Sequence, residues 1–100
     1  MTPLERDIEK HLRHVVGGMG GLCLKWVCPG WAGVPDRIVL TPGGHISFVE
    51  LKRPEGGVIS PRQAEWAKRL RRLGFGVYFV KSHEEVNALA LILRSEMEGL

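Results

Sequence analysis

Residues 48–54 (FVELKRP) carry two charges inside a stretch that otherwise has the composition of a β-strand. Residues two positions apart on a strand point to the same face, so Glu50 and Lys52 are expected side by side, next to the apolar Phe48 and Ile46. Burying a charge is costly unless the charge is paired or holds a metal ion. This stretch is therefore either a buried ion pair or a functional site, and the rest of the chain has to decide between them.

The length of 100 residues suits one domain with one modest core, and we take residues 1–100 as a single unit. Charged residues make up 25% of the chain and hydrophobic residues 44%, which is ordinary for a soluble globular protein. The formal net charge of +3 indicates an anionic partner. No apolar run approaches the ~20 residues of a membrane span, and the first residues do not resemble a signal peptide. We therefore expect a cytoplasmic protein without a membrane partner.

Three helices are expected, and two of them begin with the same capping signature. Thr-Pro-Leu-Glu at residues 2–5 starts a helix over residues 3–16, and Ser-Pro-Arg-Gln at residues 60–63 starts one that ends at Gly74. A third helix should cover residues 83–97. The apolar positions expected to face the core are Leu4, Ile8, Leu12 and Val15, then Trp66, Ala67, Leu70 and Leu73, and finally Val86, Leu89, Ala90, Leu93 and Met97.

Apolar runs separated by turn residues predict four strands, at residues 22–28, 38–40, 46–52 and 76–81. With the helices they give the order α-β-β-β-α-β-α. This order is typical of an α/β domain in which helices flank a central mixed sheet. Leu91 and Ile92 fall outside the core face of the last helix and leave spare apolar surface there.

The two middle strands form a hairpin whose register can be predicted. If residues 42–44 make a three-residue loop, Thr41 opposes His45, and Asp36 opposes Glu50. Directly opposed residues on antiparallel strands have Cβ atoms roughly 4.5–5.5 Å apart. The sequence thus predicts two carboxylates and Lys52 on one patch, although a one-residue change in loop length would move this pairing.

Such a patch has a recognisable chemistry. Two carboxylates can hold a hard divalent cation such as Mg²⁺, which polarises a phosphoryl oxygen and lowers the pKa of a bound water. A lysine beside it can orient or deprotonate the attacking water and offset the negative charge of the transition state. A basic face on the second helix could contact the phosphates of a polyanion; its members are Arg62, Lys68, Arg69, Arg71 and Arg72, with Glu65 the only acid.

The sequence Val-Pro-Asp at residues 34–36 followed by Glu-Leu-Lys at residues 50–52 resembles the PD-(D/E)xK signature of the restriction-endonuclease-like superfamily. The wider pattern adds an early acid on the first helix, Gly-Val-Pro-Asp-Arg at residues 33–37 and Ser-Pro-Arg-Gln at residues 60–63. This pattern is similar to that of the VRR-NUC nucleases of the stand-alone phage and bacterial type, and it covers essentially the whole chain.

The resemblance implies a restriction-endonuclease-like fold and an Mg²⁺- or Mn²⁺-dependent DNA endonuclease. Its substrate would be a Holliday junction or other branched or structured DNA, and it would act as a homodimer in the bacterial cytoplasm, or in the host cytoplasm if a phage encodes it. By matching position, the metal ligands would be Asp36, Glu50 and the backbone carbonyl of Leu51, and Lys52 would be the catalytic lysine. Gln63 and Glu5 also match catalytic positions, with Glu9 as an alternative to Glu5. The arginines expected to contact DNA are Arg37, Arg53, Arg62, Arg69 and Arg72.

Each of these residues also has a purely structural interpretation. Asp36 follows a proline and could be a turn residue, and Glu50 with Lys52 could be an ion pair. Glu5 and Gln63 each hold the third position of a capping box, and the basic face could simply be solvated. Two other functions stay open: a DNA-binding module that does not cleave, and an interaction protein that uses the last helix.

The three tryptophans divide into two groups. Trp26 and Trp66 are expected in the core. Trp31 lies in the loop before Asp36, where it could stack on a base, pack at a subunit contact or pack within the loop.

Overall fold

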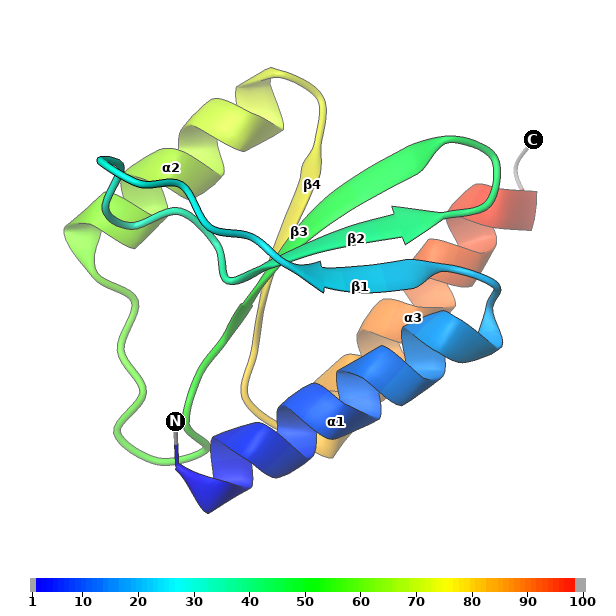
Figure 1. Ribbon diagram of the computed structural model, residues 1–100, viewed down its shortest axis with the longest axis horizontal. Helices are drawn as coiled ribbons and strands as arrows, with labels where there is room; N and C mark the ends of the chain where they lie inside the picture. The colour runs from blue at the N-terminus through cyan, green and yellow to red at the C-terminus, as the bar shows by residue number, and fades with distance from the viewer. Residues whose placement is uncertain (1, 99–100) are drawn as a thin grey trace.

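A four-stranded sheet with helices on both faces forms the structure, a computed structural model that describes residues 2–98 (Figure 1). The elements are α1 (Pro3–Gly18), β1 (Leu22–Lys25), β2 (Arg37–Thr41), β3 (His45–Leu51), α2 (Pro61–Arg72), β4 (Gly76–Val80) and α3 (His83–Glu98). The predicted element order and the mixed α/β sheet are confirmed. In the part of the chain that the structure describes, no helix is long and apolar enough to cross a membrane.

The strands lie in the order β1-β2-β3-β4. The first three run antiparallel, while β4 joins β3 in parallel after the chain has crossed over through α2. The predicted hairpin register is confirmed, because Thr41 pairs with His45 and Arg37 with Val49. Continuing this register by one residue places Asp36 opposite Glu50.

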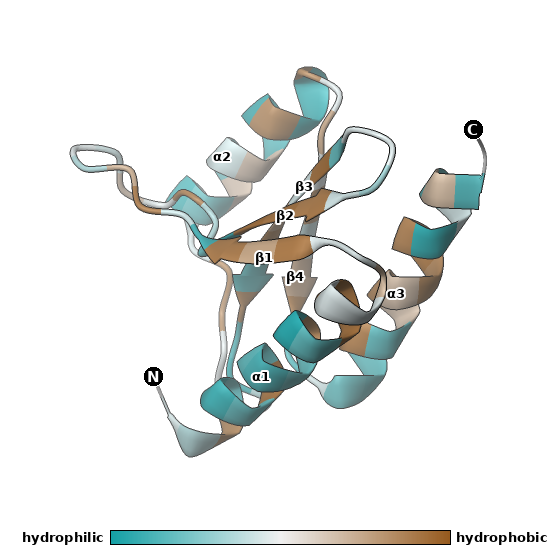
Figure 2. Ribbon diagram, turned by 45° about the vertical axis from the view of Figure 1, so that its right-hand side comes forward, coloured by the Kyte–Doolittle hydropathy of each residue, from teal (hydrophilic) through white to brown (hydrophobic). Residues whose placement is uncertain are grey.

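The helices divide between the two faces of the sheet. In Figure 1, α1 and α3 lie together on one face and α2 covers the other alone. Figure 2 shows apolar residues concentrated on the strands, between mainly hydrophilic outer faces of α1 and α2. Because successive strand residues alternate between faces, Val49 and Leu51 join the α1/α3 core, whereas Phe48 packs toward α2. Glu50 has the same parity as Phe48 and therefore also faces α2.

Some predicted boundaries and core positions are wrong. The first strand ends at Lys25 instead of residue 28, because its partner strand begins only at Arg37. Leu4 and Leu73 are 63% and 72% exposed, and they lie at the ends of their helices, Leu4 in the first turn of α1 and Leu73 at the C-cap of α2. Ile46, one residue from the hairpin loop end of β3, is 38% exposed.

Candidate active site

Asp36 is fixed between two strands, immediately before β2. Its carbonyl accepts a hydrogen bond from the Trp26 N–H at 2.7 Å, which extends the β1 ladder by one residue. Its own N–H donates to Glu50 Oε1 at 3.1 Å, and its carboxylate Oδ2 accepts from the Leu51 N–H at 3.2 Å. The predicted pairing of Asp36 with Glu50 is therefore present, while the Asp36 residue stays exposed to solvent.

Glu50 is buried, with 6% of its surface exposed, and it is a charged residue inside a strand. Its Oε2 accepts a hydrogen bond from Gln63 Nε2 at 3.0 Å and lies 3.7 Å from Lys52 Nζ. On β4 its direct neighbour is Phe79, which offers no polar partner. Burial first, and then the nearby Asp36 carboxylate, raise the pKa of Glu50 to about 7 from an ordinary 4.5, against the opposing effect of the Lys52 ammonium group.

Gln63 connects the start of α2 to both charged groups of β3. Its Oε1 accepts hydrogen bonds from Lys52 Nζ at 2.6 Å and from the Ser60 N–H at 3.0 Å, while its Nε2 donates to Glu50. The Ser60 side chain accepts from the Gln63 N–H, so the predicted capping box is also present. Gln63 thus has both of its predicted contacts, one as a helix cap and one in the site.

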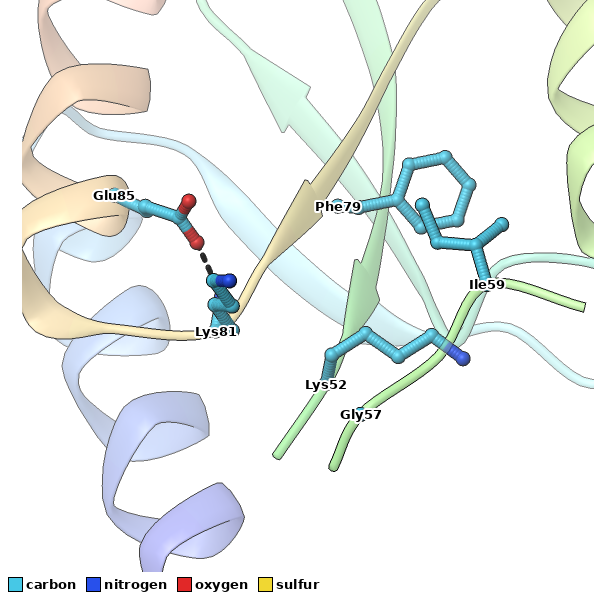
Figure 3. A pocket seen from close by; sticks show the side chains of 6 residues that line it. All are labelled: Lys52, Gly57, Ile59, Phe79, Lys81 and Glu85. Atoms are coloured by element: carbon cyan, nitrogen blue, oxygen red, sulfur yellow. Dashed lines mark hydrogen bonds between the residues drawn. The ribbon is translucent and has the colours of Figure 1, made fainter. Parts of the chain in front are cut away.

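Asp36, Glu50 and Lys52 line one open pocket of about 380 Å³ at the end of β3, named here the catalytic pocket after these candidate residues. It is lined by Glu5, Asp36, Glu50, Leu51, Lys52, Arg53, Gly57 and Val58. The last two come from the loop between β3 and α2, and neither was among the predicted site residues. A second pocket of about 230 Å³ lies beside it and shares Lys52, whose side chain runs toward the chain at Gly57 and Ile59 in Figure 3.

Glu5 and Glu9 occupy different environments although they are one helical turn apart. Glu5 lines the open pocket, and its Oε1 accepts hydrogen bonds from the Thr2 N–H and hydroxyl in the α1 capping box. Glu9 instead forms a largely buried ion pair with Arg37, at 2.8 Å. Arg37 therefore points toward α1 with its guanidinium group engaged, apart from the arginines of α2.

Comparisons with known proteins show which family the chain is similar to. The chain is 45% identical over 80 residues to "Putative nuclease p44" of Acyrthosiphon pisum secondary endosymbiont phage 1, and the match covers 80% of this chain and 85% of that protein. A solved structure described as "VRR_NUC domain" is similar with a TM-score of 0.82 and 33% identity, over 88% of this chain and 95% of that chain. The chain belongs to the VRR-NUC family of nucleases. No family model matches the sequence.

The donor atoms of this VRR-NUC site suit a hard divalent cation. Within residues 2–98 no three His, Cys, Asp or Glu side chains gather to hold a metal ion, so the protein would supply only a few of the oxygen ligands of a cation. Mg²⁺ accepts that arrangement, because it usually takes one or two carboxylates and completes its shell with water and phosphate oxygens. The Asp36 carboxylate helps to raise the pKa of Glu50, and a cation bound between the two groups would offset this repulsion.

The backbone carbonyl of Leu51 is a suitable third oxygen. In an antiparallel ladder the N–H and C=O groups of one residue point toward the same neighbouring strand, and the Leu51 N–H points to Asp36. The hairpin register, continued by two residues, places Pro35 opposite Leu51. Proline has no N–H to donate, so that position offers the Leu51 carbonyl no ladder partner.

Substituting each helix-one acid with glutamine should separate their roles. Glu5→Gln keeps the capping box, because glutamine serves as well as glutamate at that position, and should lower cleavage about tenfold with an unchanged unfolding midpoint. Glu9→Gln should leave the activity per folded molecule unchanged but lower the free energy of unfolding by about 2 kcal/mol, since Arg37 loses its partner. Urea unfolding and cleavage rates measure both. Full activity in Glu5→Gln would leave Glu5 as a cap alone.

The raised pKa of Glu50 makes stability depend on pH. The folded state binds the proton of the Glu50 carboxyl group more tightly than the unfolded chain does. The contribution of this proton to the free energy of unfolding is therefore complete below pH 4.5 and is lost as the pH rises through about 7. In EDTA, the wild type should lose about 2 kcal/mol relative to Glu50→Gln between pH 5 and pH 8. Urea unfolding of both proteins across that range measures the difference; parallel pH dependences would contradict the shift. Adding Mg²⁺ at pH 8 should stabilise the wild type alone.

Proposed function

We propose that this VRR-NUC chain is an Mg²⁺- or Mn²⁺-dependent endonuclease that hydrolyses phosphodiester bonds in branched or otherwise structured DNA. The observation that carries the proposal is the continuous network from Asp36 through Glu50 and Gln63 to Lys52 beside one open pocket. A structural ion pair would need neither the second carboxylate nor an opening to solvent. Family membership supports the same reaction class.

Each member of the network has a part in phosphodiester hydrolysis. Asp36, Glu50 and the Leu51 carbonyl would hold the cation, which when bound polarises a phosphoryl oxygen and lowers the pKa of a water. Lys52 places a positive charge at the same pocket and can orient the attacking water and offset the charge that develops on the phosphate. Gln63 keeps the Lys52 amine in place through a hydrogen bond of 2.6 Å.

The expected path of the DNA follows the cationic side chains around this pocket. Arg53 is exposed and lines it, and Arg62, Arg69 and Arg72 are exposed along α2. Arg69 makes an ion pair with Glu65 at 3.6 Å, but both side chains are about half exposed, so the pair is weak and can yield to a phosphate. Contacts of this kind position a nucleic acid and make its binding sensitive to salt.

Cleavage assays on defined DNA structures test the proposal directly. Labelled four-way junction, flap, splayed-arm and plain duplex DNA are incubated with the protein in Mg²⁺, in Mn²⁺ or in EDTA. We expect cleavage of the branched substrates in either metal, slower cleavage of the duplex, and none in EDTA. Binding of all four without cleavage in any metal would favour a DNA-binding module, and no binding at low salt would favour an interaction protein.

We further propose that the enzyme is a homodimer that presents two active sites. The support is spare apolar surface, because Leu91 and Ile92 on α3 are 69% and 43% exposed, next to a pocket of about 310 Å³ along β4. Sedimentation equilibrium should give twice the mass of the chain. Ile92→Arg should give a folded monomer, because it places a charge in this surface, whereas Leu22→Arg, at an exposed position on β1, serves as the matched control and should stay dimeric. A wild-type monomer at high protein concentration would contradict the proposal.

A further inference from the structure

A second hollow of about 320 Å³ lies between α2 and the loop that precedes Asp36. Its exposed large apolar side chain is that of Trp31, of which 60% is accessible. We call this hollow the tryptophan pocket; it is lined by Gly30, Trp31, Ala32, Arg62, Glu65, Trp66 and Arg69. So much of this tryptophan ring lies in water that it is free to contact a ligand.

Aromatic and cationic groups in the tryptophan pocket hold one another in a defined arrangement. The ring of Trp31 meets that of Trp66 edge to face, with centroids 5.6 Å apart and planes at 88°. The Arg69 guanidinium carbon lies 5.3 Å from the centroid of Trp66, within the range of a cation–π contact. Trp66, which was expected in the core, is half-buried and packs against the ring of Trp31. The ring of Trp31 itself stays exposed.

The tryptophan pocket is built on the same two segments as the active site. On α2, Arg62 immediately precedes Gln63, which contacts Glu50 and Lys52. On the loop, Gly33 approaches α2 so closely that a Cβ there would lie 2.8 Å from the Arg62 Cβ, at a φ of +91° that favours glycine. Three residues later the same loop supplies Asp36. A group held on Trp31 is thereby tied in position to the catalytic pocket.

We propose that the tryptophan pocket binds an unpaired nucleobase of the DNA substrate, stacked on Trp31, with its phosphates near Arg62 and Arg69. Aromatic side chains stack on bases of any sequence, and arginines contact the backbone phosphates at the same time. The faces of a base inside a duplex are covered by its neighbours, so only an unpaired base can enter. The inference rests on DNA being the substrate, and it supplies a physical reason for selectivity toward branched DNA.

The charge of the tryptophan pocket agrees with this ligand. Arg62 and Arg69 stand against Glu65 alone, so the pocket keeps net positive charge. The Glu65–Arg69 pair is exposed and 3.6 Å long, which leaves Arg69 able to turn to a phosphate. A purely apolar partner, such as the core of a protein interface, would instead have to cover these cations without neutralising them.

Fluorescence of 2-aminopurine tests the inference without cleavage. The probe is placed either in the single-stranded arm of a splayed duplex or within a plain duplex, and binding is measured in Ca²⁺. We expect the wild type to quench the arm probe by stacking. Trp31→Ala should lose this quenching and bind the splayed DNA about tenfold more weakly, with duplex affinity unchanged within about twofold. Trp31→Phe should keep most of both effects, and Leu73→Ala, at an exposed position near the end of α2, serves as the control.

The outcomes distinguish this inference from the proposed enzymatic activity. Equal weakening on both DNAs, or no weakening at all, would overturn the base-binding role of Trp31 even if the wild type cleaves branched DNA. A change of oligomeric state in Trp31→Ala would overturn it in favour of a subunit contact. Conversely, quenching that depends on Trp31 in a protein that cleaves no DNA would support the base site and refute the nuclease activity.

Discussion

Replacing Asp36 with asparagine, or Glu50 with glutamine, is expected to lower the rate of DNA cleavage by about a thousandfold or more, while the protein still folds and binds DNA. Each substitution removes one of the two negative charges proposed to hold the cation and keeps the size of the side chain. Asp36→Asn is the cleaner of the two, because its amide oxygen can still accept from the Leu51 N–H. Glu50→Gln replaces one acceptor with a donor, so it loses one of two hydrogen bonds, either that from the Asp36 N–H or that from Gln63 Nε2.

The rates of the two variants and the wild type are compared by single-turnover cleavage of labelled branched DNA, and their DNA affinities are measured separately in Ca²⁺. Asp7→Asn is the matched control, since it removes an exposed carboxylate of α1 that pairs with His83 at 2.7 Å and does not line the catalytic pocket. That control should cleave within about twofold of the wild type, as surface substitutions away from a site generally have small effects. Cleavage by Asp36→Asn within tenfold of the wild type would remove its role as a ligand.

The β2–β3 hairpin was predictable from the sequence because a short loop determines register. The residues Pro42, Gly43 and Gly44 allow a three-residue connection, and both glycines adopt positive φ, at 93° and 79°. The neighbour of β3 on its other side was not predictable to the same degree. That strand arrives through α2, and its parallel pairing depends on how the crossover packs against the sheet.

The candidate site shows the same division between local and tertiary information. The pairing of Asp36 with Glu50 follows from the hairpin register, and the structure confirms it. The contact of Lys52 with Gln63 depends on the course of residues 53–60, an irregular loop with no periodic pattern. The choice between Glu5 and Glu9 likewise depends on the angle at which α1 crosses the sheet, which its apolar spacing does not specify.

Replacing Lys52 with methionine is expected to lower the rate of cleavage by about a hundredfold to ten-thousandfold at pH 7. The substitution keeps a long apolar stem and removes the charge that Gln63 holds at 2.6 Å. It should also raise the pKa of Glu50 further, because the Lys52 ammonium group opposes that rise. Metal affinity should then be weak at pH 7 and recover toward pH 9 as Glu50 ionises, so part of the lost rate should return with pH.

Lys81→Met provides the matched control for this prediction. Lys81 is exposed and lines the pocket that Figure 3 shows beside Lys52, and the β3–β4 register, continued by one residue, places it across from Lys52. Lys81→Met removes the same positive charge at a nearby position, but Lys81 does not line the catalytic pocket. If both variants lose cleavage equally and both recover on lowering the salt, the loss reflects weaker DNA binding in general. A loss confined to Lys52→Met at saturating DNA, of which only part returns at high pH, would place the Lys52 amine at the reacting phosphate. Complete recovery at high pH would instead mean that Lys52 acts only through the pKa of Glu50.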